Sequence, residues 1–188
     1  HINKFIKRNN IDIQLIDAFI GRGGLTKPVK SGIYEVNSMM LDDLENCKYG
    51  EHASNLGGVI AHQMASVNGQ KAYIADPVVV DEMSSVAKIS GLNGITRRPL
   101  WHALSQKAVG KKYAEKIGLQ YEDLNLIIAH LGGGISVGLH KRGRVTDVNN
   151  ALNGDGPFSP ERTGGLPVSE IYELAFSGQY TLEQIKKL

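Results

Sequence analysis

Apolar positions in the first 120 residues alternate between strand-like and helix-like spacing. Ile11, Ile13 and Leu15 alternate with polar residues, which predicts a strand, and the run ends in a glycine-rich loop at 21–24. Apolar residues that recur every three or four positions predict helices, one of which Asn68-Gly69 stops. The expected elements after the loop are helices at 38–44 and 56–67, a strand at 72–75 that ends at Asp76-Pro77, and a helix from Trp101 that Gly118 can close.

The pattern becomes strand-rich after residue 124. An apolar run at 124–129, an alternation at 135–139 and a third run at 144–148 predict three strands. Residues 141–143 are typical of a hairpin turn, so the strands are expected to form a meander. The remaining expected elements are a loop at 149–166, a helix with Pro167 in its first turn and Gly178 as its cap, and a last helix opened by the capping-box spacing of Thr181 and Gln184.

Composition narrows the class of protein. At about 150 residues per domain, 188 residues make one large domain or two small ones, and Gly, Asn and Pro at 91–99 indicate the boundary. The formal charge of +2, with both signs interspersed, argues against a nucleic-acid-binding domain. The longest weakly polar stretch, 126–139, contains His130 and three glycines, so no membrane span is predicted. The single cysteine, Cys47, indicates a reducing compartment.

The sequence lacks the motifs of several common catalytic sites. It has no Walker A loop, no G-x-G-x-x-G fingerprint, no G-x-S-x-G elbow and no histidine pair at metal-ligand spacing. What remains is the run His-Leu-Gly-Gly-Gly-Ile-Ser at 130–136, between two predicted strands. Such glycines let consecutive N–H groups face one anion. The alternative is a tight turn with glycines at positive φ and nothing bound, and the spacing leaves both open.

Four further residues have both a functional and a structural interpretation. Arg22 and Arg162 lie in loops rich in glycine, where a guanidinium could bind a carboxylate or phosphate or simply be solvated. Asp76 follows a strand, where α/β active sites gather, but Asp before Pro is also a good helix N-cap. His102 begins a predicted helix, where a buried, hydrogen-bonded histidine is the simpler interpretation.

Taken together, these segments resemble the acetate and butyrate kinase family. Residues 126–143 resemble its second signature, in which a histidine and a glycine loop lie between two strands. Residues 147–152 and 156–162 look like butyrate and branched-chain fatty-acid kinases more than acetate kinases. The other similar segments are 97–102, which corresponds to the segment with the family's active-site histidine, 72–76, which corresponds to the strand ending in its catalytic aspartate, and 21–24, which corresponds to its first substrate arginine loop.

The resemblance implies an α/β protein of actin-like ATPase fold with parts of two ribonuclease-H-like domains. Residues 1–95 would be the C-terminal part of the first domain, and 96–188 the start of the second with the phosphate-binding glycine loop. The implied reaction is reversible transfer of the γ-phosphoryl group of ATP, with Mg²⁺ present, to butyrate or a branched short-chain fatty acid. The partners would be the acid and ATP or ADP, with no nucleic acid or membrane, in a cytoplasmic homo-oligomer, a dimer or larger.

The same matching assigns expected roles to individual residues. Arg22 and Arg162 would bind the acyl carboxylate and the moving phosphoryl group, and Asp76 would orient substrate or metal. His102 would donate to an equatorial oxygen of the transition state. Asp76, His102 and Arg162 would thus be catalytic, and no metal ligand is assigned. The expected cradle for the ATP phosphates consists of His130, Gly132, Gly133 and Gly134.

Several departures from the family pattern shape these expectations. Gly133 stands where acetate kinases have asparagine, the Arg22 loop is shorter, and residues 100–106 lack their second histidine, which fits a butyrate-type enzyme. The chain starts at His1 and has neither the Asn-x-Gly-Ser phosphate loop nor the late metal-binding glutamate, so a central, inactive fragment is expected. The alternatives are an actin-like sugar or acid kinase outside this family, and a non-catalytic nucleotide- or anion-binding module of actin-like fold.

Overall fold

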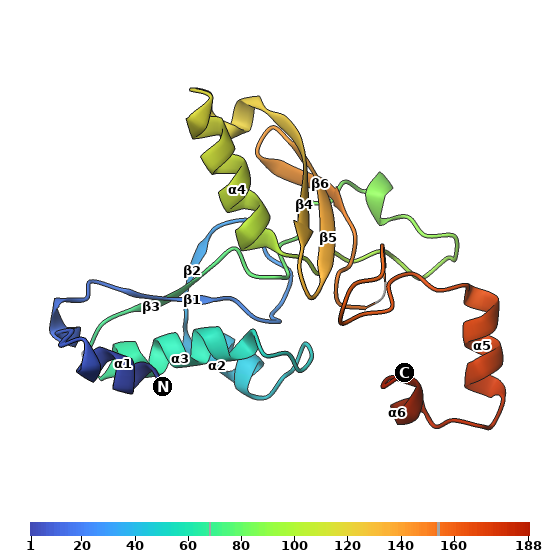
Figure 1. Cartoon of the computed structure of the whole chain (residues 1–188), viewed down its shortest axis with the longest axis horizontal. Coiled ribbons are helices and arrows are strands. Elements are labelled where there is room, and N and C mark those ends of the chain that lie inside the picture. The colour runs from blue at the N-terminus through green and yellow to red at the C-terminus, as the bar shows by residue number, and fades with distance from the viewer. Residues whose placement is uncertain (68, 154) are drawn as a thin grey trace.

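Two three-stranded sheets organise the molecule, which we describe from a computed structural model covering residues 1–67, 69–153 and 155–188 (Figure 1). The first sheet has the order β1-β3-β2 and the second the order β4-β5-β6. The strands are β1 (Phe19–Arg22), β2 (Ile33–Glu35), β3 (Ala72–Ala75), β4 (Asn125–Leu131), β5 (Ile135–Lys141) and β6 (Arg144–Val148). The α-helices are α1 (Ile2–Arg8), α2 (Ser38–Glu45), α3 (Asn55–Ser66), α4 (Ala103–Lys116), α5 (Val168–Phe176) and α6 (Leu182–Ile185). The 3₁₀ helices of the described residues are η1 (Ile13–Leu15), η2 (Val86–Lys88) and η3 (Tyr121–Asp123).

The predicted strand at 11–15 is wrong. Residues Ile13–Leu15 form η1, because the Asp12 side chain accepts a hydrogen bond from Gln14 N (3.0 Å) and so stabilises a local turn. The strand starts later, at Phe19, where β3 supplies a parallel partner. Gly21 and Arg22, expected in a loop, are therefore the last residues of β1. The helix α1, the strand β2 and the 3₁₀ helices η2 and η3 were not expected from the sequence pattern.

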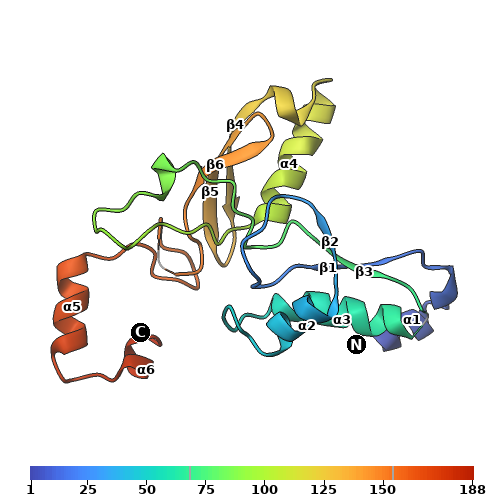
Figure 2. The ribbon, with the colours of Figure 1, turned by 180° about the vertical axis from the view of Figure 1, so that it is seen from behind.

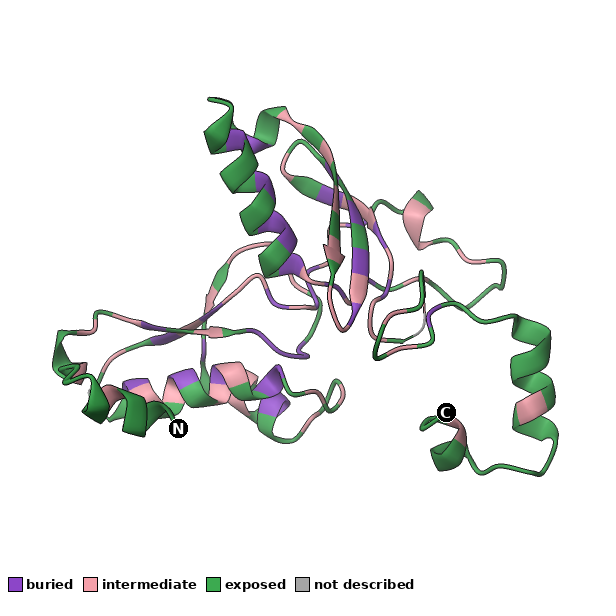
Figure 3. Ribbon diagram, in the orientation of Figure 1, coloured by how far each residue is buried: buried purple, intermediate pink, exposed green. Residues whose placement is uncertain are grey.

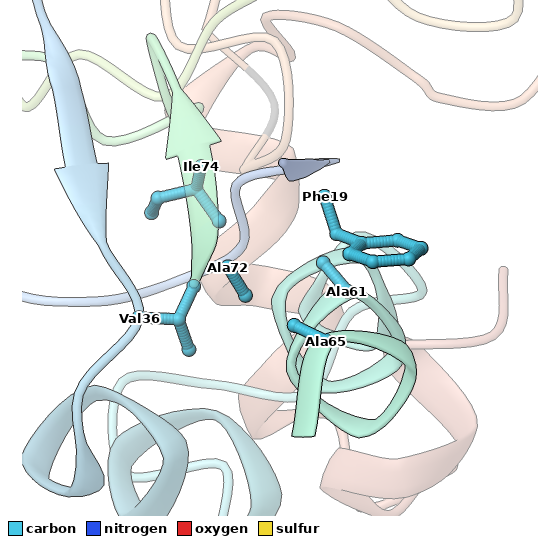
Figure 4. Close-up of a cluster of buried hydrophobic side chains, with 6 residues drawn as sticks. All are labelled: Phe19, Val36, Ala61, Ala65, Ala72 and Ile74. Atoms are coloured by element: carbon cyan, nitrogen blue, oxygen red, sulfur yellow. The ribbon is translucent and has the colours of Figure 1, made fainter. Parts of the chain in front are cut away.

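The first core lies between the first sheet and α3 (Figure 4). Helix α3 was expected from apolar spacing and is confirmed; of its predicted stop signal, Asn68 lies outside the described residues and Gly69 has a φ of +65°. Strand β1 and α3 approach so closely that a Cβ atom on Gly57 would collide with the carbonyl oxygen of Arg22. The buried members of this core are Phe19, Val36, Ala61, Ala65, Ala72 and Ile74.

The predicted meander at 124–148 is confirmed. Strands β4, β5 and β6 pair antiparallel in chain order, and Arg142 and Gly143 turn the hairpin with φ of +49° and +78°. Helix α4 is also confirmed, with Gly118 just beyond its end at a φ of +73°. In Figure 1, α4 lies along one face of this sheet.

The face of β5 that α4 covers is polar. Ser136, Gly138 and His140 are buried on it, while Val137 and Leu139 on the opposite face are 38% and 44% exposed (Figure 3). Gly138 leaves room for the Gln106 side chain of α4, because a Cβ atom there would lie 2.5 Å from Gln106 Oε1. Polar groups buried in this way need hydrogen-bond partners, and α4 supplies them.

A second core joins the meander to the segment that follows β3. Val80 and Met83 pack with Trp101, Ala103 and the valines of β6. Trp101 is 2% exposed and donates its indole N–H to Val80 O (2.8 Å). The chain thus crosses from the first sheet to the second core before residue 90.

The two C-terminal helices stand apart from both sheets (Figures 1 and 2). Helix α5 starts after Pro167, and α6 starts at the predicted capping box, in which Thr181 Oγ1 and Gln184 Oε1 each accept a hydrogen bond from the other residue's backbone N–H. Among the described residues, no helix combines the length and the apolar character that a membrane crossing requires.

Candidate active site

A cavity of about 530 Å³ brings together most of the residues singled out from the sequence. Its walls come from the end of β1, the start of α4, the turn after β4 and the loop before α5. Of the predicted site residues, Gly132 does not line this cavity but adjoins it in the glycine turn. The predicted residues that line it are Arg22, Asp76, His102, His130, Gly133, Gly134 and Arg162.

Parallel pairing of β1 with β3 places Arg22 and Asp76 at the same edge of the first sheet. Arg22 pairs with Ala75, the residue before Asp76. The carboxyl ends of neighbouring parallel strands meet at one edge, which is where open α/β sheets bind ligands. Arg22 is exposed and lines the cavity from this edge.

Asp76 is not a helix N-cap. No helix begins at Pro77, and the next described helical turn, η2, starts only at Val86. Asp76 instead has a φ of +36°, and its Oδ1 accepts hydrogen bonds from Ser31 Oγ (2.6 Å) and Gly32 N (2.8 Å). These two hydrogen bonds hold the Asp76 carboxylate in one position at the cavity wall, and aspartate is among the residues that tolerate a positive φ.

The glycine turn between β4 and β5 differs from the simple turn considered above. None of Gly132, Gly133 and Gly134 has a positive φ. Two of them are closely approached by side chains of the loop before α5: a Cβ atom on Gly133 would lie 2.5 Å from Glu161 Oε1, and one on Gly134 would collide with Arg162 Nη1. The turn is thus shaped to let the loop that contains Arg162 approach.

That loop is held on the turn through one carbonyl group. Gly133 O accepts hydrogen bonds from Ser159 Oγ (2.6 Å) and Glu161 N (3.2 Å). Ser159 and Arg162 also form an isolated antiparallel bridge, with Ser159 N donating to Arg162 O (2.8 Å). The Arg162 side chain is 26% exposed, and its Nη1 lies 3.9 Å from Glu161 Oε2. Arg162 is therefore not a solvated surface arginine.

Two histidine rings are stacked at the start of α4. The centroids of His102 and His130 are 3.8 Å apart, with 10° between their planes. Burial, the neighbouring His130 and the two arginines lower the pKa of His102 from 6.5 to about 4. Burial and Arg22 also lower the pKa of His130. Both rings are therefore neutral near pH 7.

A third histidine, His52, lines the same cavity and was not recognised from the sequence. Its Nδ1 lies 2.7 Å from Ser54 Oγ, just before α3. Burial, Arg162 and Arg22 lower the pKa of His52, and both arginines line the same cavity. The sequence offered no signal for it, because its position depends on α3 packing against β1.

The charge of the site suits an anion with several oxygens. Two guanidinium groups and three neutral imidazoles face the cavity, and the carboxylates of Asp76 and Glu161 also line it. No group of three or more His, Cys, Asp or Glu side chains in the described part of the chain could hold a metal ion by itself. Mg²⁺ commonly binds one or two carboxylates together with substrate phosphates, and these two carboxylates fit that requirement.

The chain is similar in sequence to butyrate kinases and, over part of its length, to the acetokinase family. Residues 93–154 match the model of the acetokinase family. Butyrate kinase 2 of Clostridium acetobutylicum is 55% identical over 186 residues, which are 99% of this chain and 52% of the relative. Butyrate kinase 1 of the same organism is 54% identical over 182 residues, 97% of this chain and 51% of the relative. The chain thus spans about half the length of these relatives.

Solved structures show the same fold. An acetate kinase of Porphyromonas gingivalis superposes with a TM-score of 0.78 at 22% identity, covering 100% of this chain and 50% of that one. A propionate kinase of Francisella tularensis subsp. tularensis superposes with a TM-score of 0.74 at 19% identity, covering 98% of this chain and 50% of that one. The predicted fold class, an actin-like α/β fold, is confirmed.

The chain is a homologue of the butyrate kinases, and its resemblance to the acetate and butyrate kinase family is confirmed.

Proposed function

We propose that the protein containing this chain is a carboxylate kinase that transfers the γ-phosphoryl group of ATP to butyrate or a branched short-chain fatty acid. The observation that carries this proposal is the cavity in which Arg22, Arg162, Asp76 and His102 converge. Phosphoryl transfer needs positioning and positive charge on spreading negative charge, and these side chains supply both. The identity to butyrate kinases supports the choice of acid.

The residues of the cavity suit separate tasks in this reaction. A carboxylate oxygen of the acid forms a bond to phosphorus while the bond from phosphorus to ADP breaks, and no strong base is needed because the acid is ionised near pH 7. Arg22 and Arg162 hold the carboxylate and the phosphoryl oxygens with charge-assisted hydrogen bonds. His102, neutral at pH 7, donates a hydrogen bond to an oxygen whose charge grows in the transition state.

In this proposal, the glycine turn binds the phosphates of the nucleotide. Gly133 and Gly134 line the cavity, the Arg162 guanidinium lies against Gly134, and His130 stands beside them at the end of β4. Mg²⁺ bound to the phosphates would neutralise charge, and Asp76 is the carboxylate whose anchored position best suits contact with it.

The location and assembly of the protein belong to the same proposal. We infer that the protein is a cytoplasmic homo-oligomer. We also infer that two ribonuclease-H-like domains divide near residues 95 and 96. Val80 and Met83, which precede that point, already pack with the second core, so limited proteolysis would test the division. Sedimentation of the full-length protein tests the assembly.

A hydroxamate assay of the full-length protein tests the activity. We expect acyl phosphate from ATP and butyrate or isobutyrate, and less from acetate. Acyl phosphate formation with none of these acids, while the protein still binds ATP, would contradict the proposal and favour a non-catalytic nucleotide-binding module. The isolated 188-residue chain, which we expect to be inactive, is the matched control.

A further inference from the structure

A continuous chain of buried hydrogen bonds leads from η3 to the cavity. Tyr121 Oη contacts His140 Nδ1, and His140 Nε2 lies 2.9 Å from Gln106 Oε1. Gln106 Nε2 lies 2.8 Å from Ser136 Oγ, which in turn lies 2.8 Å from His102 Nδ1. The first four residues are 4%, 0%, 1% and 0% exposed, and only His102 reaches the cavity. The catalytic proposal above uses none of these four.

One backbone carbonyl group determines which groups donate and which accept along this chain of hydrogen bonds. Gln106 Nε2 also lies 2.9 Å from Ser136 O, and a carbonyl oxygen only accepts hydrogen bonds. The amide nitrogen of Gln106 must therefore face Ser136, and its oxygen must face His140. His140 then carries its proton on Nε2 and leaves Nδ1 to accept from the Tyr121 hydroxyl. Burial lowers the pKa of His140 to about 4, so the ring holds only this proton near pH 7.

Ser136 transmits this direction to His102. Its hydroxyl oxygen accepts from Gln106 Nε2 and, at 3.4 Å, from the backbone N–H of His102. A hydroxyl has two lone pairs and one hydrogen, so once both lone pairs are occupied, its hydrogen remains for the contact with His102 Nδ1. His102 Nδ1 is then an acceptor, and the proton of the neutral ring lies on Nε2, on the opposite edge from Ser136.

We propose that the chain Tyr121–His140–Gln106–Ser136 fixes the tautomer of His102, so that a protonated Nε2 is available as a hydrogen-bond donor to the oxygens of the reacting phosphoryl group. Ser136 and Gln106 are the decisive positioning residues, since they determine which nitrogen of His102 carries the proton. Tyr121 and His140 orient Gln106 but are less critical, because Ser136 O holds the amide by itself. Donation to the phosphoryl oxygens rests on the proposed kinase function, whereas the tautomer of His102 does not depend on it.

The tautomer can be observed directly in the full-length protein. In protein labelled with ¹⁵N-histidine, long-range ¹⁵N–¹H spectra distinguish a protonated ring nitrogen from a bare one, and His102→Gln identifies the His102 signals. We expect a proton on Nε2 and a bare Nδ1. A proton on Nδ1 of the parent protein would overturn the proposal. This measurement needs no catalysis, so the tautomer can be confirmed even if the protein phosphorylates none of the acids tested.

Two substitutions test the positioning role. Ser136→Ala removes the donor to Nδ1 and should give a mixture of His102 tautomers, with kcat reduced on the order of tenfold and KM for the acid little changed. Gln106→Met frees a lone pair of Ser136 Oγ to accept from Nδ1, so the tautomer should shift toward a protonated Nδ1. Tyr121→Phe should leave both tautomer and kcat close to the parent values.

Val145→Ala is the matched control. Val145 lies on the neighbouring strand, is 1% exposed and has an apolar side chain outside the hydrogen-bond chain. The cavity it creates should lower the melting temperature but leave the His102 tautomer and kcat unchanged. An equal change of tautomer in Val145→Ala and Ser136→Ala would indicate general loosening of the sheet and overturn the proposal. If Ser136→Ala fails to fold, the parent spectrum and Gln106→Met still decide the question.

Discussion

The imidazole rings of His102 and His130 lie almost parallel, with centroids 3.8 Å apart and 10° between their planes. Protonation of both stacked rings beside two guanidinium groups would bring like charges close together, so the site favours neutral histidines. His102, the residue just before α4, and His130, from the end of β4, meet because α4 packs on the second sheet.

Stability is therefore expected to depend on pH in acid. The pKa of His102 and of His140 is about 4 in the folded protein, against 6.5 when unfolded. The unfolded state binds more protons between these values, so their contribution is complete above pH 6.5 and is lost as the pH falls toward 4. We expect the melting temperature to fall between pH 6.5 and 4.5, and to fall less steeply in His102→Asn. Equal slopes in variant and parent would contradict this.

Arg162→Ala should lower kcat by on the order of a hundredfold, because one well-placed donor to a transition-state oxygen is removed. The melting temperature should change little, since the loop is held through Gly133 O by Ser159 and Glu161. Arg8→Ala, on the exposed helix α1, is the matched control and should retain parental kinetics. Parental kinetics in Arg162→Ala would show that the guanidinium takes no part in the reaction.

Asp76→Asn should lower turnover at least a hundredfold while the protein stays folded. The asparagine oxygen can still accept from Ser31 and Gly32, and asparagine tolerates the positive φ at this position. Only the negative charge beside the phosphates is lost. Steady-state kinetics and thermal melting distinguish the two effects, and a fully active Asp76→Asn would show that the charge has no part in the reaction.

Gly134→Ala should disrupt the site, because the new methyl group would occupy the space of Arg162 Nη1. Displacement of the guanidinium should reduce kcat about as much as Arg162→Ala. Gly91→Ala, where a Cβ atom would meet nothing within 4 Å, is the control and should be neutral. If the double variant Gly134→Ala/Arg162→Ala loses the product of both single effects, the two residues act independently and the collision is not the cause.

Much of the secondary structure could be predicted from local sequence patterns. The spacing of apolar residues predicted α3 and the meander, and the Thr181 and Gln184 pair predicted the cap of α6. These elements depend on contacts between residues close in the chain, which the sequence pattern contains. The strand expected at 11–15 was wrong because a strand needs a partner, and in this part of the chain β3 pairs with residues 19–22 and not with 11–15.

The candidate site was predictable as a set of residues but not as an arrangement. Arg22, Asp76, His102, His130 and Arg162 were named from motifs, yet each motif left a structural alternative open. Asp76 as a helix cap was eliminated only by the backbone after β3. His52, and the hydrogen bonds by which Ser136 and Gln106 orient His102, depend on packing between elements distant in the chain. Sequence by itself determined which side chains were available, and tertiary structure decided which of them meet, because burial and hydrogen-bond direction are set by neighbours that local periodicity does not encode.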